Sequence, residues 1–412
     1  MIEEEELTAA TTKTFLQLSG RMEHVSEAAT LRIAARAVEL RAEGRKIISL
    51  STGEPDFPTP DRIKRAGIRA IEENFTKYTP AEGLPELRAI VAEKFRRDNN
   101  IETSTDCIQI SSGGKHALSN AVSVLVERGD EVIIPSPFWV SYPAMVAIAE
   151  GTTVLVNTKS SDEWVLSARA LRKAITPRTK AIMLNTPHNP TSAMYSQRDL
   201  EALVDVIEET GIYAIVDELY EKLVYDGERH FSLGSIPEIA DQVITVNGLS
   251  KAYAMTGWRL GYATGPRHVI EAMNRLQSQA VSHPSSISQR AAIEALTGPQ
   301  DDVETMRLRF ESRRDLVVRI MSVIPGISYS KPKAAFYVFF DVSRFFGRKF
   351  ANGDRVGTAD DICSALLEQH GLALVPGGAF GSPNHIRLSF AASEADIEAG
   401  VALLKEGLST IH

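Results

Sequence analysis

One lysine stands in a run of small and apolar residues, which is an unusual neighbourhood for a surface lysine. Lys251 follows the apolar stretch 243–246, which reads as a short buried strand. A buried ammonium without a partner is costly, so such a lysine tends to become neutral or covalently bound. Neutral lysine attacks carbonyl groups, which makes a Schiff base the first hypothesis, and the nearby Arg259 is placed to hold an anion. The alternative for the lysine alone is an ordinary solvated loop.

Two glycines and a cation connect a predicted strand at 108–110 to a predicted helix. Gly113 and Gly114 form the turn, and Lys115 comes next. Glycines at a helix N-terminus let backbone N–H groups reach a phosphate, and the helix dipole favours the negative charge. A Gly-Gly pair alone is usually only a turn. The lysine favours an anion site here, because a cation at a helix N-terminus is unfavourable unless an anion is near.

Three further side chains each have an ordinary interpretation and a chemical one. Asp217 follows the strand-like stretch 213–216 and either caps the next helix or, beside a pyridine ring, stabilises the protonated ring nitrogen. Tyr220 lies one helical turn further, on the same face as Asp217. Arg387 alternates with apolar neighbours, so it either points to solvent or offers a bidentate fork to a carboxylate. The residues alone leave both interpretations open.

The elements that must position these residues are short apolar strands alternating with amphipathic helices, from about residue 62 onwards. This order predicts an α/β fold with a mostly parallel sheet between helices. Ligands bind such sheets beyond the carboxyl ends of the strands, where polar stretches should therefore gather. Polar stretches do follow the predicted strands, at 111–115, 136–142, 185–191, 217–220 and 247–251. The predicted strands are 108–110, 132–134, 153–156, 181–184, 213–216 and 243–246.

The pattern changes after about residue 300. A long charged helix at 304–320 precedes strand-like stretches at 335–340, 373–375 and 385–390, with a helix near 359–370. This predicts a smaller α+β domain that the N-terminal segment joins. We therefore expect a mobile arm over 1–15, an N-terminal part of the small domain over 16–60, a large domain over 61–300 and a small C-terminal domain over 301–412.

Composition excludes several classes of protein. The 412 residues carry a net charge of -8, which gives no basic footprint for nucleic acid or an anionic membrane. No run reaches the ~18 apolar residues of a membrane span. The only cysteines, Cys107 and Cys363, have no metal-binding spacing, so we expect neither disulfides nor a metal site. A reducing cytoplasm fits best.

Several stretches together carry a resemblance. The residues from Gly248 to Lys251, followed by Met255 to Gly261, resemble the pyridoxal-phosphate lysine motif of class I aminotransferases. The stretches 136–142, 185–192 and 217–220 resemble other motifs of that family, in the same order. The likeness runs from about Thr30 to the C-terminus and is closest to the bacterial and plastid-type aspartate and prephenate aminotransferases. It implies fold type I, with the large domain binding pyridoxal 5'-phosphate.

The resemblance also implies roles for particular residues. Lys251 would hold the cofactor and act as general base and acid. The implied contacts to the cofactor come from Gly113, Gly114, Lys115, Trp139, Asn189, Asp217, Tyr220, Ser250, Arg259 and Tyr78. The implied contacts to the substrate come from Gly53, Trp139, Asn189, Arg387, Lys115 and Thr30. Ser250 is expected to compensate for Gly248, which stands where many relatives have serine. The counterpart of Tyr78 reaches across a two-fold interface, which implies a homodimer with shared active sites.

The implied activity is reversible ping-pong transamination. Lys115 and Thr30 match positions that hold a distal carboxylate, so we expect aspartate or glutamate as donor, 2-oxoglutarate or oxaloacetate as acceptor, and prephenate as a further possibility. An aromatic or broad-specificity aminotransferase is one alternative, and a pyridoxal-phosphate lyase or oxidase on the same fold is another. A cofactor-binding transcription regulator is a third, but the residues before Thr30 are too few and too acidic for its DNA-binding domain.

Overall fold

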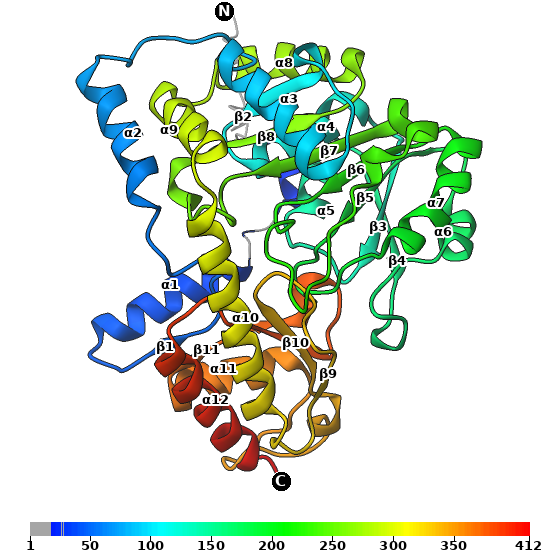
Figure 1. Cartoon of the computed structure of the whole chain (residues 1–412). Coiled ribbons are helices and arrows are strands. Elements are labelled where there is room, and N and C mark those ends of the chain that lie inside the picture. Colours follow the sequence, from blue (N-terminus) through cyan, green and yellow to red (C-terminus); the bar gives the residue numbers. More distant parts are fainter. Residues whose placement is uncertain (1–17, 26, 28) are drawn as a thin grey trace, which may run out of the picture.

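The structure is a computed structural model that describes residues 18–25, 27 and 29–412. The expected mobile arm over 1–15 lies outside the described residues. Figure 1 shows two groups of elements: a large sheet together with its helices, and a smaller group of short strands and helices. The long helix α10 (Asp301–Met321) runs between the two groups.

The large sheet has seven strands, and five neighbouring strands are parallel. In sheet order the strands are β2 (Ile108–Ser111), β8 (Gly261–Thr264), β7 (Val243–Gly248), β6 (Tyr213–Asp217), β5 (Thr179–Asn185), β3 (Glu131–Ser136) and β4 (Thr152–Asn157). The α/β prediction is confirmed, and all six predicted strands are present. The sequence analysis missed β8, which is antiparallel to both β2 and β7. This strand has only four residues, and because they include a glycine and an alanine they show no strand pattern in the sequence.

Alternate side chains of the parallel strands enter two different cores. Met183 and Ile215 face a core made with α4 (Gly114–Leu125), α5 (Tyr142–Ile148) and α8 (Arg267–Ala280). Leu184 and Val216 face a core made with α6 (Ala168–Ala174) and α7 (Gln197–Thr210). All four side chains are at most 1% exposed, which explains why these strands read as continuous apolar runs.

A third core lies beside the β2–β8 edge of the sheet. It combines apolar side chains of these two strands with those of α3 (Pro85–Asn99) and α9 (Ser286–Thr297), while α2 (Asp61–Glu72) packs on α9. Phe95 of α3 and Tyr262 of β8 meet edge to face with ring centroids 5.5 Å apart. The last residues of α3 are thereby held close to the sheet.

Local signals fix where α7 begins and ends before β6. Ser196 and Asp199 form a reciprocal capping box at its start, and Gly211 ends it with a φ of 68°. A left-handed residue at this position favours glycine. The chain then enters β6 after one more residue, which places Asp217 at the carboxyl edge of the sheet.

The smaller group of elements combines both ends of the chain. A four-stranded sheet has the order β12 (Val375–Pro376), β13 (His385–Ser389), β10 (Tyr337–Asp341) and β9 (Ser328–Tyr329). The N-terminal β1 (Ile48–Ser49) pairs in parallel with β11 (Leu372–Ala373). The accompanying helices are α1 (Ala29–Ala42), α11 (Ala359–His370) and α12 (Glu394–Ser409). The single strand expected over 373–375 is wrong in detail, because Leu374 separates β11 from β12. The domain boundaries at 60/61 and 300/301 stay predictions.

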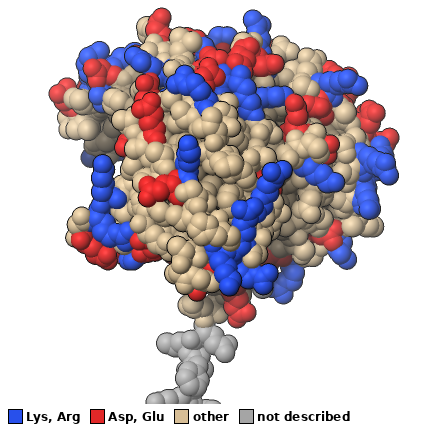
Figure 2. Space-filling view, turned by 90° about the horizontal axis from the view of Figure 1, so that it is seen from below, with Lys and Arg blue, Asp and Glu red and all other residues tan. Residues whose placement is uncertain are grey.

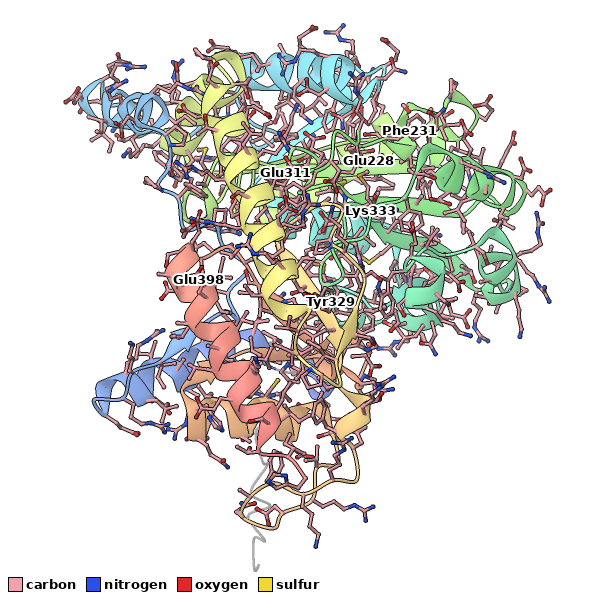
Figure 3. The ribbon with its side chains drawn as sticks, turned by 60° about the horizontal axis from the view of Figure 1, so that its bottom comes forward. Glu228, Phe231, Glu311, Tyr329, Lys333 and Glu398 are labelled. Carbon is pink, nitrogen blue, oxygen red and sulfur yellow. The ribbon has the colours of Figure 1, made fainter. Side chains whose placement is uncertain are left out.

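An ion pair fastens α10 to the segment that follows β6. Buried Arg314 donates to both carboxylate oxygens of Asp226, at 2.8 Å each. Glu311, also on α10, accepts from Arg307 at 2.8 Å and from the backbone N–H of Asp226 at 2.6 Å. Figure 3 shows Glu311 on α10, with Glu228 labelled nearby. The bidentate geometry and the burial of the arginine make this a specific contact between the two groups of elements.

Charges of both signs are interspersed on the face that Figure 2 shows, rather than forming one basic field. Across the part of the chain that the structure describes, none of the helices has the length and apolar character needed to cross a membrane.

Candidate active site

A cavity of about 400 Å³ opens at the carboxyl ends of β5, β6 and β7. The N-terminus of α4 borders it, and Tyr337 and Arg387 reach it from the smaller group of elements. Twelve of the residues predicted for the site line this cavity: Thr30, Gly53, Gly114, Lys115, Trp139, Asn189, Asp217, Tyr220, Ser250, Lys251, Arg259 and Arg387. Gly113 and Tyr78 do not. The stretches chosen from the sequence therefore come together in one place.

Lys251 lies in the turn after β7, with its ammonium at the cavity wall. Its Nζ donates a hydrogen bond of 2.6 Å to the carbonyl oxygen of Gly53 and lies 5.9 Å from the centroid of the Tyr220 ring. Burial lowers the pKa of Lys251 to about 8, although the carboxylate of Glu54 opposes the shift. An amine with such a pKa is partly neutral near pH 7, which a nucleophile for carbonyls or a general base requires.

Asp217 is buried at the end of β6. Burial raises the pKa of its carboxyl group to about 6, although two donors favour its ionised form. The Tyr142 hydroxyl donates to Oδ2 at 2.7 Å, and the backbone N–H of Leu219 donates to Oδ1 at 3.2 Å. The sequence analysis did not assign Tyr142 a role, although this residue ends the aromatic stretch 136–142 that it singled out.

Tyr220 meets a residue that the sequence analysis missed. Its hydroxyl lies 2.8 Å from that of Tyr337, and both side chains are buried. Burial, reinforced by Tyr337, raises the pKa of Tyr220 well above its usual value, so its hydroxyl stays protonated. A Cβ at position 53 would overlap the Tyr337 hydroxyl, which is why a glycine is needed there. The stretch 335–340 was read only as a strand, and no spacing in it marked Tyr337 as a site residue.

The turn before α4 forms a cradle of backbone and guanidinium groups. Gly113 adopts a φ of 94°, and a Cβ there would overlap the Arg259 guanidinium. A Cβ on Gly261 would meet the backbone of Gly114, so the end of β8 also packs closely here. Arg259 donates to the carbonyl oxygen of Thr256 at 2.8 Å. Backbone N–H groups at a helix N-terminus beside an arginine suit an oxyanion such as phosphate.

Lys115 and Trp139 border the same side of the cavity. The Lys115 ammonium lies 4.9 Å from the centroid of the Trp139 ring, and burial lowers the pKa of Lys115, with Arg259 adding to the effect. Trp139 in turn meets Tyr142 edge to face at 5.4 Å. The indole is thus fixed by packing, while the cation beside it is free to meet an anion in the cavity.

Arg387 is buried on β13, contrary to the solvent-facing interpretation. It is 2% exposed and donates to Asn189 Oδ1 at 3.0 Å and to the carbonyl oxygen of Ser51 at 2.6 Å. Its Nε has no hydrogen-bond partner, and no carboxylate among the described residues forms an ion pair with it. Burial lowers its pKa, but a guanidinium stays charged in proteins. A buried cation with only neutral acceptors is a site for an anionic ligand.

Tyr78 lies away from the cavity of its own chain. Its side chain is 90% exposed, and its ring lies edge to face with that of His283, with centroids 5.5 Å apart. The side chains that line the cavity carry more positive than negative groups. Lys115, Lys251, Arg259 and Arg387 outnumber the two carboxylates, Glu54 and Asp217, so the cavity favours ligands with several negative charges.

A lysine of lowered pKa, a carboxylate behind it and an anion cradle at the edge of a mostly parallel sheet define an enzyme of carbonyl and amine chemistry. Comparison with known proteins identifies its kind. Residues 45–404 match the family model for aminotransferases of class I and II. The chain therefore belongs to the class I and II aminotransferase family, and it is a transaminase resembling the aspartate aminotransferases.

Individual relatives span nearly the whole chain. A probable aspartate/prephenate aminotransferase of Rickettsia felis is 41% identical over 396 residues, covering 96% of this chain and 97% of the relative. An aspartate aminotransferase of a Bacillus species, strain YM-2, is 43% identical over 93% of this chain and 97% of its own. The crystal structure of the aspartate aminotransferase from Rhizobium meliloti superimposes with a TM-score of 0.93 at 42% identity, over 97% of this chain and 100% of that one. The aspartate aminotransferase from Thermus thermophilus with maleate gives 0.90 at 40% identity, over 95% and 100%.

Proposed function

We propose that this transaminase uses pyridoxal 5'-phosphate to transfer the amino group of aspartate or glutamate to 2-oxoglutarate or oxaloacetate, with prephenate as a further acceptor. The observation that supports an amino-acid donor is the buried Arg387, whose guanidinium has only neutral partners within the described residues and would bind an α-carboxylate. A dicarboxylic donor also needs a second cation, and the Lys115 side chain lines the same cavity beside Trp139.

The donor set fits the cofactor. The glycine turn at α4 with Arg259 suits the phosphate, since the absence of a Cβ on Gly113 lets the Arg259 guanidinium lie against the turn, and the absence of one on Gly261 lets β8 pack on the backbone of Gly114. Asp217 suits a protonated ring nitrogen, and the Tyr220 hydroxyl is placed to donate to a ring oxygen. When bound, the cofactor supplies an electron-withdrawing ring that weakens the bonds at Cα of an amino acid.

The chain's own groups perform the remaining work. Arg387 orients the α-carboxylate of the donor, and the small Gly53 lets the backbone approach the same group. Lys251 Nζ would take the proton from Cα of the donor and deliver it to the C4′ carbon of the cofactor, and it would move a proton in the opposite direction in the second half of the cycle. Its pKa of about 8 places it near the working pH for both directions. Asp217, ionised above about pH 6, keeps the positive charge of the ring nitrogen in place.

A donor–acceptor matrix, read by the 2-oxo acid formed, tests the assignment. We expect aspartate and glutamate to react well with 2-oxoglutarate, and phenylalanine to react poorly. The absorption of the cofactor should change when donor alone is added, and should change back with acceptor. A Lys251→Ala protein that still transferred amino groups at the wild-type rate would contradict the role of this lysine.

We also propose that two chains form a homodimer in which each Tyr78 serves the partner's cavity. The Tyr78 side chain supports this, because it is 90% exposed and does not line the cavity of its own chain, so it is available to a second chain. Complementation tests it. Lys251→Ala and Tyr78→Ala proteins, each weak alone, should regain activity when mixed and reassembled, because one site of each hybrid dimer is intact. Sedimentation at the mass of one chain would rule the dimer out.

The two cysteines support a reducing compartment as the location. Cys107 and Cys363 are both unpaired, and Cys363 is buried. We place the enzyme in the cytoplasm on this ground. Fractionation of cells that express the tagged chain tests the location directly.

A further inference from the structure

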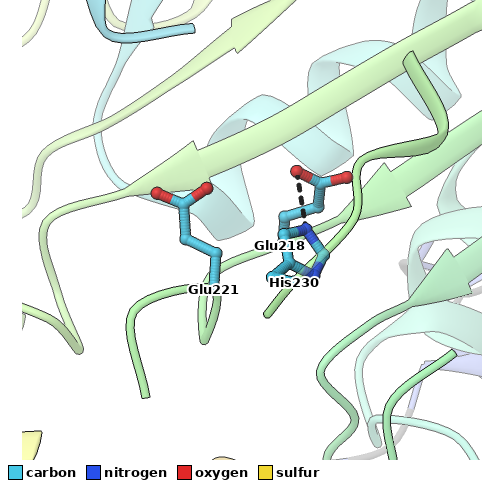
Figure 4. Close-up of side chains that lie close together, drawn as sticks. All are labelled: Glu218, Glu221 and His230. Carbon is cyan, nitrogen blue, oxygen red and sulfur yellow. Dashed lines mark ion pairs between the residues drawn. The ribbon is translucent and has the colours of Figure 1, made fainter. Parts of the chain in front are cut away.

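Two carboxylates lie among the cavity residues at the end of β6 and in the turn that follows it. Asp217, Leu219 and Tyr220 line the cavity, whereas Glu218 and Glu221 do not. Their side chains are 0% and 6% exposed, so both are buried behind the cavity wall. Figure 4 shows Glu218 and Glu221 beside His230, with the ion-pair contact between Glu218 and His230. Buried carboxylates outside the reaction space require a reason, because burial of a charge is costly.

Glu218 is held by donors from two distant segments. Its Oε2 accepts hydrogen bonds from Ser232 Oγ at 2.7 Å and from Asn99 Nδ2 at 3.1 Å, and His230 Nε2 lies 3.2 Å away. Asn99 is the last residue of α3, and the other two follow β6 in a loop. Two hydrogen-bond donors and an imidazole nitrogen therefore converge on a single carboxylate oxygen.

Glu221 extends the same network towards α3. It forms an ion pair with Lys94, which is 2% exposed, and its Oε2 accepts from Asn99 Nδ2 at 2.7 Å. Burial raises the pKa of Glu221, but the charges of Lys94, Lys222 and His230 together outweigh this effect, so the pKa is lowered overall. Lys94 also donates to Asn99 Oδ1 at 2.7 Å. The turn 217–221 is therefore tied to the end of α3 at two points.

Ligand atoms of Glu218, Glu221 and His230 lie within 4.8 Å of one another, a spacing that a metal ion would also require. The amide nitrogen of Asn99 already bonds to both carboxylates, however, and the Lys94 ammonium neutralises Glu221. Protein donors thus occupy one oxygen of Glu218 and both oxygens of Glu221, whereas Glu218 Oε1 and His230 Nδ1 have no hydrogen-bond partner among the described residues. The contacts favour a protein network over an ion.

We propose that Glu218 is a positioning residue for the transamination: it holds the turn so that Asp217 faces the ring nitrogen of the cofactor, and it adds a second negative charge behind that carboxylate. The proposal rests on the proposed binding of pyridoxal phosphate. Two adjacent carboxylates strengthen the negative potential at the ring nitrogen and keep it protonated. The charge of Glu218 contributes to the raised pKa of Asp217, although burial is the larger cause.

The test compares Glu218→Gln with Glu131→Gln. The glutamine keeps the size and an acceptor oxygen but removes the charge. Glu131 is a matched control, because it is buried at the amino end of β3, away from the cavity, where it accepts from Arg178 and Thr176. Ser232→Ala, which removes one donor and leaves the Glu218 charge, is a milder second variant. Each protein is examined for cofactor affinity, for the pH dependence of cofactor absorption, and for unfolding temperature without cofactor.

We expect Glu218→Gln to bind pyridoxal phosphate about 10-fold more weakly than wild type and to lower kcat more than it raises KM, as loss of an outer partner of a site commonly does. Glu131→Gln should match wild type in cofactor affinity and absorption. This difference from Glu218→Gln should remain even if the two variants have similar unfolding temperatures. Equal affinity and absorption in the two variants would refute the positioning role. The role would also be refuted if the wild-type chain bound one zinc ion and the Glu221→Gln protein did not. If wild type itself binds no pyridoxal phosphate, the proposed function fails instead.

Discussion

The Tyr142 hydroxyl donates a hydrogen bond of 2.7 Å to the buried carboxylate of Asp217. Without this donor, burial alone would push the pKa of Asp217 above its value of about 6. The contact therefore keeps an acid that is shielded from water ionised at neutral pH. It connects the first residue of α5 with the last residue of β6.

Replacing Tyr142 by Phe should raise the pKa of Asp217. A group with a raised pKa is ionised only at higher pH, so the acidic limb of the kcat/KM profile should move upward. The pH profile of cofactor binding measures the same change without turnover. Tyr213→Phe is a suitable control, because that hydroxyl meets only His268, at 3.2 Å. An unchanged acidic limb in Tyr142→Phe would show that Asp217 does not depend on this donor.

Glu54→Gln should lower the pKa of Lys251 further below about 8, since Glu54 is the main group that opposes the effect of burial. The free amine would then be neutral at lower pH. The rate at which the cofactor-free protein reacts with an amine reagent at Lys251, followed by peptide mapping across pH, measures the shift. Glu73→Gln, at the end of α2, serves as control. A midpoint moving upward would contradict the electrostatic argument.

Arg387→Lys keeps the charge but loses the planar fork. We expect kcat/KM for aspartate to fall about 100-fold, equivalent to about 2.7 kcal/mol, because the bidentate contact to a carboxylate is lost. The unfolding temperature should change little, since Arg387 has no acidic partner among the described residues. Steady-state kinetics and thermal unfolding of the same preparation decide this. A large drop in stability with unchanged kcat/KM would reverse the assignment.

Lys115→Ala should lower kcat/KM for aspartate far more than for phenylalanine, because only the dicarboxylic donor has a second charge for this ammonium. Removal of a charge-assisted hydrogen bond costs about 2 kcal/mol, or roughly 30-fold. Equal losses for the two donors would assign Lys115 to the cofactor instead of the substrate.

The sequence predicted the parallel strands, and the polar stretches after them lie together because they must gather at one edge of a sheet. Thr30, Gly53 and Arg387 lie outside those stretches, and only the family resemblance indicated that they belong near the cavity. The sequence did not predict Tyr142 or Tyr337, whose importance arises from partners far along the chain: Asp217 is 75 positions from the first and Tyr220 is 117 from the second. No local pattern encodes such contacts. It also missed β8, whose strand character comes from pairing on both sides rather than from its own four residues.

The Ser51 carbonyl oxygen, which accepts a hydrogen bond from Arg387, lies 336 positions before that arginine in the chain. During synthesis, Lys251, Asp217 and the glycine turn are therefore translated long before β13, which carries the arginine that is proposed to bind a carboxylate. A nascent chain holds the groups proposed for the cofactor before it holds a complete substrate site. We expect substrate binding to be acquired only once synthesis ends, so a chain shortened before β13 should not bind a dicarboxylate.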